Sequence, residues 1–256
     1  MKKGLLLVLM LFMLPIAYSS ILIDGPDKSV YNLGDDISIF GYVITASEFS
    51  GFLGTALECN GATFNLPNTV VSMDANEKKN MGSDIQLPKL TISSSVPPGI
   101  CTLKLSLISG QAVVDSAMSK EFEVRKGLKG DFAIDKEKLQ IGKTFKLTGN
   151  VYKFSGSNAN GGIEIYFKNN ETRFLVDIAD LKDGRVEYSY KVLQIPEGPY
   201  KIDLFANDIY GNQMLFEDVA EFTVVSRLSV SIKASETLLK PGDKVKVYGK
   251  DRKSVV

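Results

Sequence analysis

The stretch "YNLGDDISIFG" at residues 31–41 decides the fold, because its outline returns as "LQIGKTFKLTG" at 139–149 and as "LLKPGDKVKVYG" at 238–249. In every copy a lead-in glycine is followed seven positions later by a second glycine. Apolar and polar residues alternate between the two glycines, as they do in a half-buried strand that is entered through a tight turn. The lead-in glycines are Gly34, Gly142 and Gly242, and the closing glycines are Gly41, Gly149 and Gly249. The sequence therefore predicts three equivalent strand openings.

A second outline occurs twice, as "VPPGICTLKLSL" at 96–107 and as "IPEGPYKIDLFA" at 195–206. Pro and Gly predict a turn, and the residues after the turn alternate as they do in a strand. Each copy is followed by a glycine turn and by a closing strand, "KEFEV" at 120–124 and "AEFTV" at 220–224. Since no convincing helical pattern follows the N-terminal segment, we expect an all-β protein made of antiparallel β-sandwiches.

The lead-in glycines recur at intervals of about 100 residues, which is the size of one seven-stranded sandwich domain. Solenoid repeats are much shorter, so this spacing predicts an array of whole domains. We expect a first sandwich at 20–126, a second at 127–226, and the first strands of an incomplete third sandwich at 227–256. Because two strands cannot bury a core, either the protein continues past Val256 or a strand from another chain completes the third sheet.

The N-terminal segment has the pattern of a secretory signal peptide. Lys2 and Lys3 form a charged head, an apolar run extends over 5–16, and a small-x-small cleavage site follows at 17–19. We therefore expect a signal peptide at 1–19 and an extracytoplasmic mature protein, either secreted or on the cell surface. The alternative is an uncleaved anchor, because residues 21–23 would extend the apolar run to a length that can span a bilayer.

At the level of fold, the sequence resembles the tandem immunoglobulin-like domains of bacterial and archaeal surface proteins. The resemblance is carried by the three lead-in glycines, by the "PPGICTLKL" and "PEGPYKIDL" strands, and by "NDIYGN" at 207–212, which is similar to the D-x-x-G-N turn of that superfamily. It covers residues 21–256 and picks out no single family. The resemblance implies tandem immunoglobulin-like sandwiches, and it implies no particular activity because a fold does not determine a function.

The two cysteines, Cys59 and Cys101, fall in the first predicted sandwich. Laying the second sandwich over the first by their glycines puts Phe167 opposite Cys59 and Tyr200 opposite Cys101. A pair of cysteines that is replaced together by a pair of aromatic residues indicates two positions that share one volume. In an oxidising compartment we therefore predict a Cys59–Cys101 disulfide. The alternative is two buried free cysteines.

The composition excludes most of the residue arrangements that enzymes commonly use for catalysis. The chain has no histidine, which excludes Ser-His-Asp and Cys-His arrangements, and two cysteines without histidine cannot build an ordinary zinc site. No P-loop and no dinucleotide fingerprint occurs. The 30 basic and 30 acidic residues cancel, and no basic stripe suits nucleic acid. We therefore expect no enzymatic activity, no catalytic residue, no cofactor, no metal site and no nucleic-acid partner.

Acidic residues that come in pairs or lie near domain ends are the remaining candidates for chemistry. Paired carboxylates can hydrolyse glycosides, and oxygen ligands at domain ends can bind calcium. We interpret the pairs as solvated acids and the domain-end residues as turn formers, because Asp and Asn bond their own backbone in turns. The pairs are Asp35 with Asp36, Asp177 with Asp180, and Glu217 with Asp218, and the calcium candidates are Asp131, Asp183, Asn207, Asp208 and Asn212.

Two kinds of surface feature are candidates for contact with sugars. The triplet "NET" at 170–172 is a sequon, so Asn170 on a predicted hairpin is a candidate for N-glycosylation in a host that makes N-glycans. Aromatic residues near loops are weak candidates for a polysaccharide platform, although we expect most of them to pack in the core or at strand edges. These loop aromatics are Phe49, Phe52, Tyr210 and Phe216.

Together these observations predict a non-enzymatic, extracytoplasmic protein of the cell envelope whose tandem sandwiches serve as a spacer, a surface-layer component or an adhesion stalk. The expected partners are other envelope or surface proteins, with surface polysaccharide as a further candidate. A membrane would take part only through an uncleaved signal segment or a C-terminal anchor outside this sequence. The alternatives are the accessory, non-catalytic region of a larger secreted enzyme and a carbohydrate-binding module.

Overall fold

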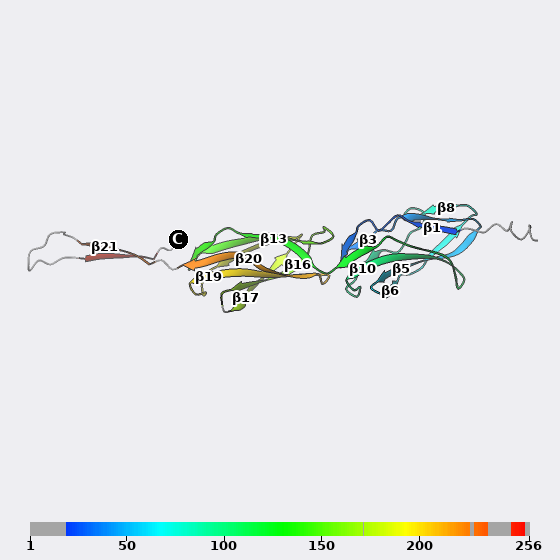
Figure 1. The fold of residues 1–256 in the computed structure, drawn as a ribbon. Coiled ribbons are helices and arrows are strands. Elements are labelled where there is room, and N and C mark those ends of the chain that lie inside the picture. Colours follow the sequence, from blue (N-terminus) through cyan, green and yellow to red (C-terminus); the bar gives the residue numbers. More distant parts are fainter. Residues whose placement is uncertain (1–18, 171, 226–227, 235–246, 254–256) are drawn as a thin grey trace, which may run out of the picture. The chain divides into compact units, whose positions relative to one another are not determined.

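The chain forms strands and turns, with no helix in the ranges that the structure describes (Figure 1). It divides into two compact units. Unit 1 consists of Met1–Lys126 together with Tyr210–Asn212, and unit 2 consists of Gly127–Ile209 and Gln213–Val256. The prediction of an all-β protein is confirmed. The structure is a computed structural model, and it describes residues 19–170, 172–225, 228–234 and 247–253.

Unit 1 has two main sheets. The smaller sheet has the order β1-β4-β8 and the larger has the order β2-β12-β10-β5-β6, with β11 also pairing β10 and β7 also pairing β5. All of these pairs are antiparallel except β2 with β12, which is parallel. The strands are β1 (Ser19–Ile23), β2 (Val30–Asn32), β4 (Gly41–Thr45), β5 (Phe49–Cys59), β6 (Ala62–Asn65), β7 (Thr69–Met73), β8 (Lys78–Asn80), β10 (Gly99–Ser109), β11 (Ala112–Met118) and β12 (Phe122–Arg125), besides the short pair β3 (Asp36–Ile37) and β9 (Leu90–Thr91).

Unit 2 repeats this arrangement with fewer strands. Its smaller sheet has the order β13-β15-β18 and its larger sheet has the order β14-β20-β19-β16-β17. The pair of β14 with β20 is parallel, as the pair of β2 with β12 is in unit 1. The strands are β13 (Leu128–Ile134), β14 (Lys138–Gln140), β15 (Thr144–Lys153), β16 (Gly161–Lys168), β17 (Arg173–Leu181), β18 (Arg185–Lys191), β19 (Gly198–Asp208) and β20 (Gln213–Val225).

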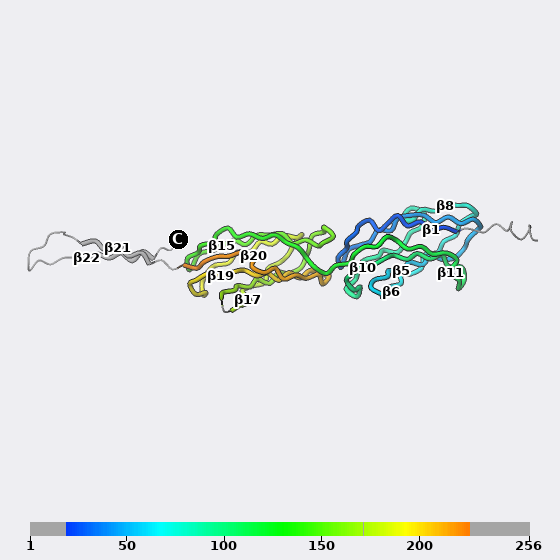
Figure 2. The backbone as a smooth tube through the Cα atoms, in the orientation of Figure 1, coloured from blue at the N-terminus to red at the C-terminus, as the bar shows by residue number. Residues whose placement is uncertain are grey.

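Each unit has its own buried core. In unit 1 every second residue of β10 from Cys101 to Leu107 is buried, as the alternation in the sequence predicts. The core side chains of unit 2 include an aromatic cluster in which the ring centroid of Phe222 lies 5.1 Å from that of Phe145 and 5.0 Å from that of Phe167. Figure 2 traces the backbone, in which β5 and β10 run side by side as antiparallel partners.

The lead-in turns of the two units have the same geometry. Gly34 has a φ of 81° and its N–H donates to the carbonyl of Ile92 at 2.7 Å. Gly142 has a φ of 90° and its N–H donates to the carbonyl of Val192 at 2.6 Å. A positive φ strongly favours glycine, which explains why this residue recurs in the repeated outline.

The third copy of the outline is described only in part. Its strands β21 (Leu228–Ala234) and β22 (Val247–Lys253) pair antiparallel with Leu228 opposite Lys253. The strands β13 and β15 of unit 2 pair in the same register, with Leu128 opposite Lys153. The opening strand pair of a sandwich is therefore formed again, while Gly242 lies outside the described residues.

Residues 1–18 of the predicted signal peptide at 1–19 also lie outside the described residues, and its last residue, Ser19, begins β1. Within the ranges that are described, no helix has the length and apolar character needed to cross a bilayer.

Candidate functional site

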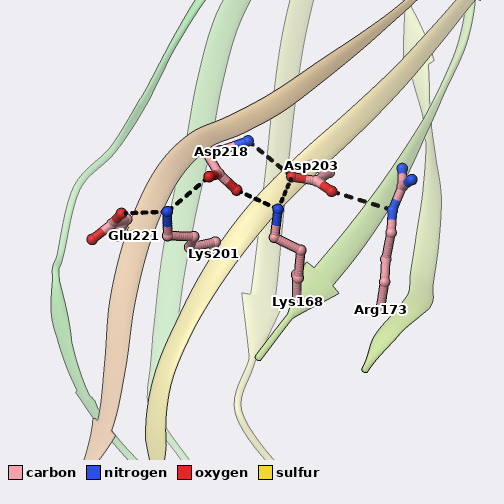
Figure 3. A network of polar contacts seen from close by, with 6 residues as sticks. All are labelled: Lys168, Arg173, Lys201, Asp203, Asp218 and Glu221. Atoms are coloured by element: carbon pink, nitrogen blue, oxygen red, sulfur yellow. Dashed lines mark hydrogen bonds and ion pairs between the residues drawn. The ribbon is translucent and has the colours of Figure 1, made fainter. Parts of the chain in front are cut away.

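A network of six charged side chains lies on unit 2 (Figure 3). It spans four neighbouring strands of the larger sheet, because the register brings the end of β16 beside β17 and β19, and β19 beside β20. The members are Lys168 on β16, Arg173 on β17, Lys201 and Asp203 on β19, and Asp218 and Glu221 on β20.

The centre of the network is a bulge in β20. Between Ile202 and Leu204 the register with β20 shifts, so that residues 217–219 stand opposite Asp203. Asp218 in this bulge has a φ of 52°, which few residues other than glycine adopt. Its backbone N–H donates to Oδ1 of Asp203 at 2.8 Å. The Asp203 carboxylate thus holds the extra residues of the bulge in place.

The Asp203 carboxylate is buried, with 1% of the residue exposed. Nε of Arg173 lies 3.3 Å from its Oδ2, and Nζ of Lys168 lies 3.8 Å from its Oδ1. A buried carboxylate is costly unless it is paired with cations and hydrogen-bonded. The two cations and the backbone N–H of Asp218 together meet that requirement.

The Asp218 carboxylate lies nearer the solvent and joins the two lysines. Nζ of Lys168 lies 2.7 Å from its Oδ1, and Nζ of Lys201 lies 2.7 Å from its Oδ2. Lys201 also lies 3.3 Å from Oε1 of Glu221. The hydrogen bonds from Lys168 and then from Lys201 lower the pKa of Asp218, and the hydrogen bond to Asp218 raises the pKa of each lysine.

A groove of ≈ 810 Å³ adjoins this network. Its walls combine polar and apolar side chains in similar measure and carry charges of both signs. A general acid for glycoside hydrolysis needs a raised carboxyl pKa, whereas the pKa of Asp218 is lowered, so Asp218 is unsuited to act as that acid. The groove suits a polar ligand better than an ionic one, because Lys168 and Lys201 are already paired with carboxylates. Its lining includes Glu137, Lys138, Asn170, Lys201, Asp218 and Glu221.

The predicted disulfide is present in unit 1. Sγ of Cys59 lies 2.11 Å from Sγ of Cys101, and neither residue is more than 1% exposed. The two cysteines face each other directly in the register of β5 with β10, so the bond joins neighbouring strands of one sheet.

The aromatic counterparts in unit 2 differ from the cysteine pair in one respect. Phe167 and Tyr200 are both buried and their ring centroids lie 6.4 Å apart, so they share a volume as the overlay predicts. However, Phe167 pairs across the sheet with Ile202 and not with Tyr200. The overlay places the residues in the right cluster but misses the register.

The predicted carboxylate pairs have different surroundings. Asp35 is buried, and its Oδ2 accepts a hydrogen bond from the N–H of Asn32 at 2.8 Å, so the interpretation as a solvated acid is wrong for this residue. Its neighbour Asp36 is exposed and pairs with Lys89 at 2.8 Å. In the other two predicted pairs, the carboxylates of β17 and β20 that are exposed to solvent include Asp177, Asp180 and Glu217.

The predicted calcium candidates take part in hydrogen bonds and ion pairs with the protein itself. Asp208 is buried 3.9 Å from Nζ of Lys153, and the N–H of Asp183 donates to Oδ1 of Asn160 at 2.7 Å. Asn212 is buried within unit 1. Within the described part of the chain, no three side chains of the ligating types gather as a metal site would require. The other two candidates, Asp131 and Asn207, are exposed on β13 and β19.

Asn170 follows the end of β16 and is exposed, as a glycan acceptor must be. The next residue lies outside the described ranges. Thr172, the third residue of the sequon, donates its N–H to Oδ1 of Asn169 at 2.9 Å. Glycosylation of Asn170 stays a prediction.

The loop aromatics do not form one platform. Phe52 is 41% exposed and Tyr210 is 46% exposed, whereas Phe49 packs against the core of unit 1. Phe216 packs against Phe132 in unit 2, with ring centroids 5.1 Å apart.

The sequence does not reveal the charged network in advance. Along β19 the residues Lys201 and Asp203 look like the outward positions of an ordinary strand. Their partners come from β16, β17 and β20, so only the register between strands brings the six charges together.

Comparison with known proteins shows likeness of fold alone. No family model matches the chain, and no curated protein matches it. The chain is similar to a tetra-tandem repeat from the extending region of a large adhesion protein, with 14% identity, 86% of this chain and 52% of that chain covered, and a TM-score of 0.37. The chain therefore spans about half the length of that structure.

Two further solved structures are similar at the same level. The fibronectin(III)-like modules of Clostridium thermocellum CbhA share 12% identity, with 80% of this chain and 93% of that chain covered and a TM-score of 0.27. An alpha-2-macroglobulin of Salmonella shares 11% identity, with 85% of this chain and 15% of that chain covered and a TM-score of 0.30. We draw nothing about activity from these likenesses.

Proposed function

We propose that this chain is a non-enzymatic, extracytoplasmic structural protein of the cell envelope, in which tandem β-sandwiches act as a spacer or adhesion stalk. The observation that carries the proposal is the repetition of one strand opening. The lead-in turn has the same hydrogen bond in units 1 and 2, and the strand pair of β21 and β22 repeats the register of β13 and β15.

The extracytoplasmic location is supported by the disulfide and by the signal-like N-terminus. Disulfides persist in oxidising compartments and are rare in reducing ones. The Cys59–Cys101 bond is therefore what a protein exported across the membrane would carry. The charged head and apolar run at 2–16 supply the matching export signal.

The location is tested on intact cells of the source organism. We expect antibodies raised against unit 1 to label whole cells, and external protease to remove the labelled protein. We also expect the mature protein to begin near residue 20 by mass spectrometry. Labelling only after lysis would contradict the proposal.

The structural role is tested by deleting the gene and measuring cell-surface adhesion and envelope integrity. We expect the deletion strain to lose adhesion or envelope integrity, and we expect the intact chain to restore the lost property. A chain with Asp203→Asn, a change expected to destabilise unit 2, reports whether a stable unit 2 is needed, and a chain with Glu221→Gln is its matched control. Unchanged adhesion and an intact envelope in the deletion strain would contradict the role.

A second candidate function, binding of surface polysaccharide, is favoured by the groove beside the charged network. Envelope polysaccharide cast into a native gel should then retard the protein. The variant Lys138→Ala, in the groove wall, should be retarded less, and Lys191→Ala, on β18 outside the groove, should behave as the parent. Equal mobility with and without polysaccharide would remove this candidate.

A further inference from the structure

The lead-in turn of unit 1 at Asn32–Asp35 is capped by the tripeptide Tyr210–Asn212, which belongs to the same unit. Asn212 is fully buried. Its Oδ1 accepts hydrogen bonds from the N–H of Leu33 at 3.2 Å and from Nδ2 of Asn32 at 3.1 Å, and its Nδ2 donates to the carbonyl of Leu33 at 2.9 Å. The amide side chain of Asn212 therefore bonds both the backbone N–H and the backbone carbonyl of Leu33.

The same cap covers the apolar part of the turn. Leu33 is only 1% exposed, and a Cβ added at Gly211 would lie 3.9 Å from Cδ1 of Leu33. A Cβ added at Gly34 would come within 2.2 Å of Cγ in the ring of Tyr210. Gly34 is thus required for its positive φ and also for the close approach of the tyrosine ring.

The lead-in turn of unit 2 at Gln140–Lys143 is built on the same backbone hydrogen bonds. Lys143 N–H donates to the carbonyl of Gln140 at 3.0 Å, and the N–H of Val192 donates to the carbonyl of Lys143 at 2.8 Å. The corresponding distances in unit 1 are 3.1 Å and 2.9 Å. The residue types are also alike, because Gln140 has an amide side chain where Asn32 does, and Ile141 is apolar where Leu33 is.

The surroundings of the two turns differ. Ile141 is 52% exposed, in contrast to the buried Leu33. A Cβ added at Gly142 would meet no heavy atom within 4 Å among the residues that the structure describes. The exposed Ile141 and the open Gly142 lie on a turn whose counterpart in unit 1 is covered, and no described residue covers these two positions as Tyr210–Asn212 covers Leu33 and Gly34.

We propose that the Gln140–Lys143 turn is a docking site for a Tyr-Gly-Asn hairpin loop carried by a further β-sandwich module. The loop would bind as Tyr210–Asn212 does on the turn at 32–35. Its asparagine would bond the N–H and carbonyl of Ile141, its glycine would lie against the Ile141 side chain, and its tyrosine ring would cover Gly142. This inference goes beyond the proposed function, because it holds equally for a stalk, an adhesin or an accessory region of an enzyme.

The test is a chain in which residues 228–256 are replaced by a second copy of 128–225, so that an extra Tyr-Gly-Asn loop follows unit 2. Isoleucine methyl groups are labelled with ¹³C and observed by NMR. The Ile141 methyl signal should shift from its position in the parent chain, because the added tyrosine ring and glycine would lie beside it. Asn212→Ala with Tyr210→Ala, made only in the second copy, should return the signal to the parent position.

An unchanged Ile141 signal, with well-dispersed methyl signals from a folded second copy, would overturn the proposal. Should the second copy fail to fold, the parent chain is titrated instead with a cyclic peptide of residues 207–213, up to roughly 1 mM because one short loop binds weakly. A shift of Ile141 that is absent with the Asn212→Ala peptide supports the site, and no shift over that range overturns it. Neither result depends on where the protein is located in the cell.

Discussion

Asp203 shows how much one residue contributes to the order of unit 2. Its side chain faces outward along β19, yet it is buried, because Lys168, Arg173 and the bulge at Asp218 cover it. Removing one partner from a buried ionic group leaves the others uncompensated, which is more damaging than losing an exposed ion pair. The same network contains the buried Asp203 and the exposed Glu221, so the effects of changing a buried and an exposed carboxylate can be compared directly.

Asp203→Asn should destabilise unit 2 by about 3 kcal/mol, since the carboxylate is replaced by a neutral amide between two cations. Glu221→Gln is the matched control and should change stability by less than about 0.5 kcal/mol, because its side chain is 68% exposed. Urea unfolding followed by tyrosine fluorescence measures both. Equal effects of the two substitutions would contradict the central position of Asp203.

We expect Asp218 to make a contribution to the stability of unit 2 that is lost in acid. Its folded pKa lies below the ordinary value of 3.8, because Lys168 and Lys201 stabilise the ionised form. A depressed folded pKa gives a contribution that is present above the unfolded pKa and is lost as the pH falls through the folded pKa. The melting temperature of unit 2 should therefore fall as the pH drops below 3.8.

The variant Asp218→Asn should lose part of this acid dependence while keeping a side chain that tolerates positive φ. Asp180→Asn is the control, because the Asp180 side chain is 77% exposed and lies 3.1 Å from Nζ of the equally exposed Lys182. Melting curves between pH 2 and pH 6 would compare the three chains, a range set around the ordinary carboxyl pKa of about 4. An acid profile of Asp218→Asn identical to that of the parent would refute the assignment.

At the scale of elements, the sequence predicts the strands well and their register poorly. The alternation in β10 and the turn glycines Gly34 and Gly142 are local signals, so the strand openings follow from the sequence alone. The bulge opposite Asp203 and the pairing of Phe167 with Ile202 depend on which residues of separate strands meet. Local propensity does not determine that choice, because it is made by the packing of the whole sheet.

The disulfide between β5 and β10 should stabilise unit 1 alone. Replacing both cysteines by serine, Cys59→Ser with Cys101→Ser, should lower the stability of unit 1 by about 2–5 kcal/mol, the usual cost of removing a native disulfide. The melting transition of unit 2 should stay in place and serves as the internal control. Reduction of the parent chain should reproduce the effect, and a chain equally stable with and without the bond would contradict it.

At the scale of the whole molecule, the two units have separate cores and should report mutations separately. Leu57 belongs to the core of unit 1 and Ile165 to the core of unit 2, and both are fully buried. A leucine or isoleucine cut to alanine in a core costs about 2–5 kcal/mol. Leu57→Ala should shift one calorimetric transition and Ile165→Ala the other. A single transition that both variants shift equally would show that the chain unfolds as one body.

The parallel ladders at the ends of each unit have a mechanical consequence. In unit 1 the early strand β2 pairs in parallel with the last strand β12, and in unit 2 β14 pairs in the same way with β20. The strands β1 and β13 come before them and pair antiparallel with β4 and β15, so a pull reaches the parallel pair once that first strand has detached. The pull then drags the two parallel strands past each other along their axes, so that all the hydrogen bonds between them bear the load at once. If the two strands were antiparallel, the same force would break the hydrogen bonds between them one after another. Within each unit, the parallel pair is therefore the part whose hydrogen bonds a pull along the strands loads together.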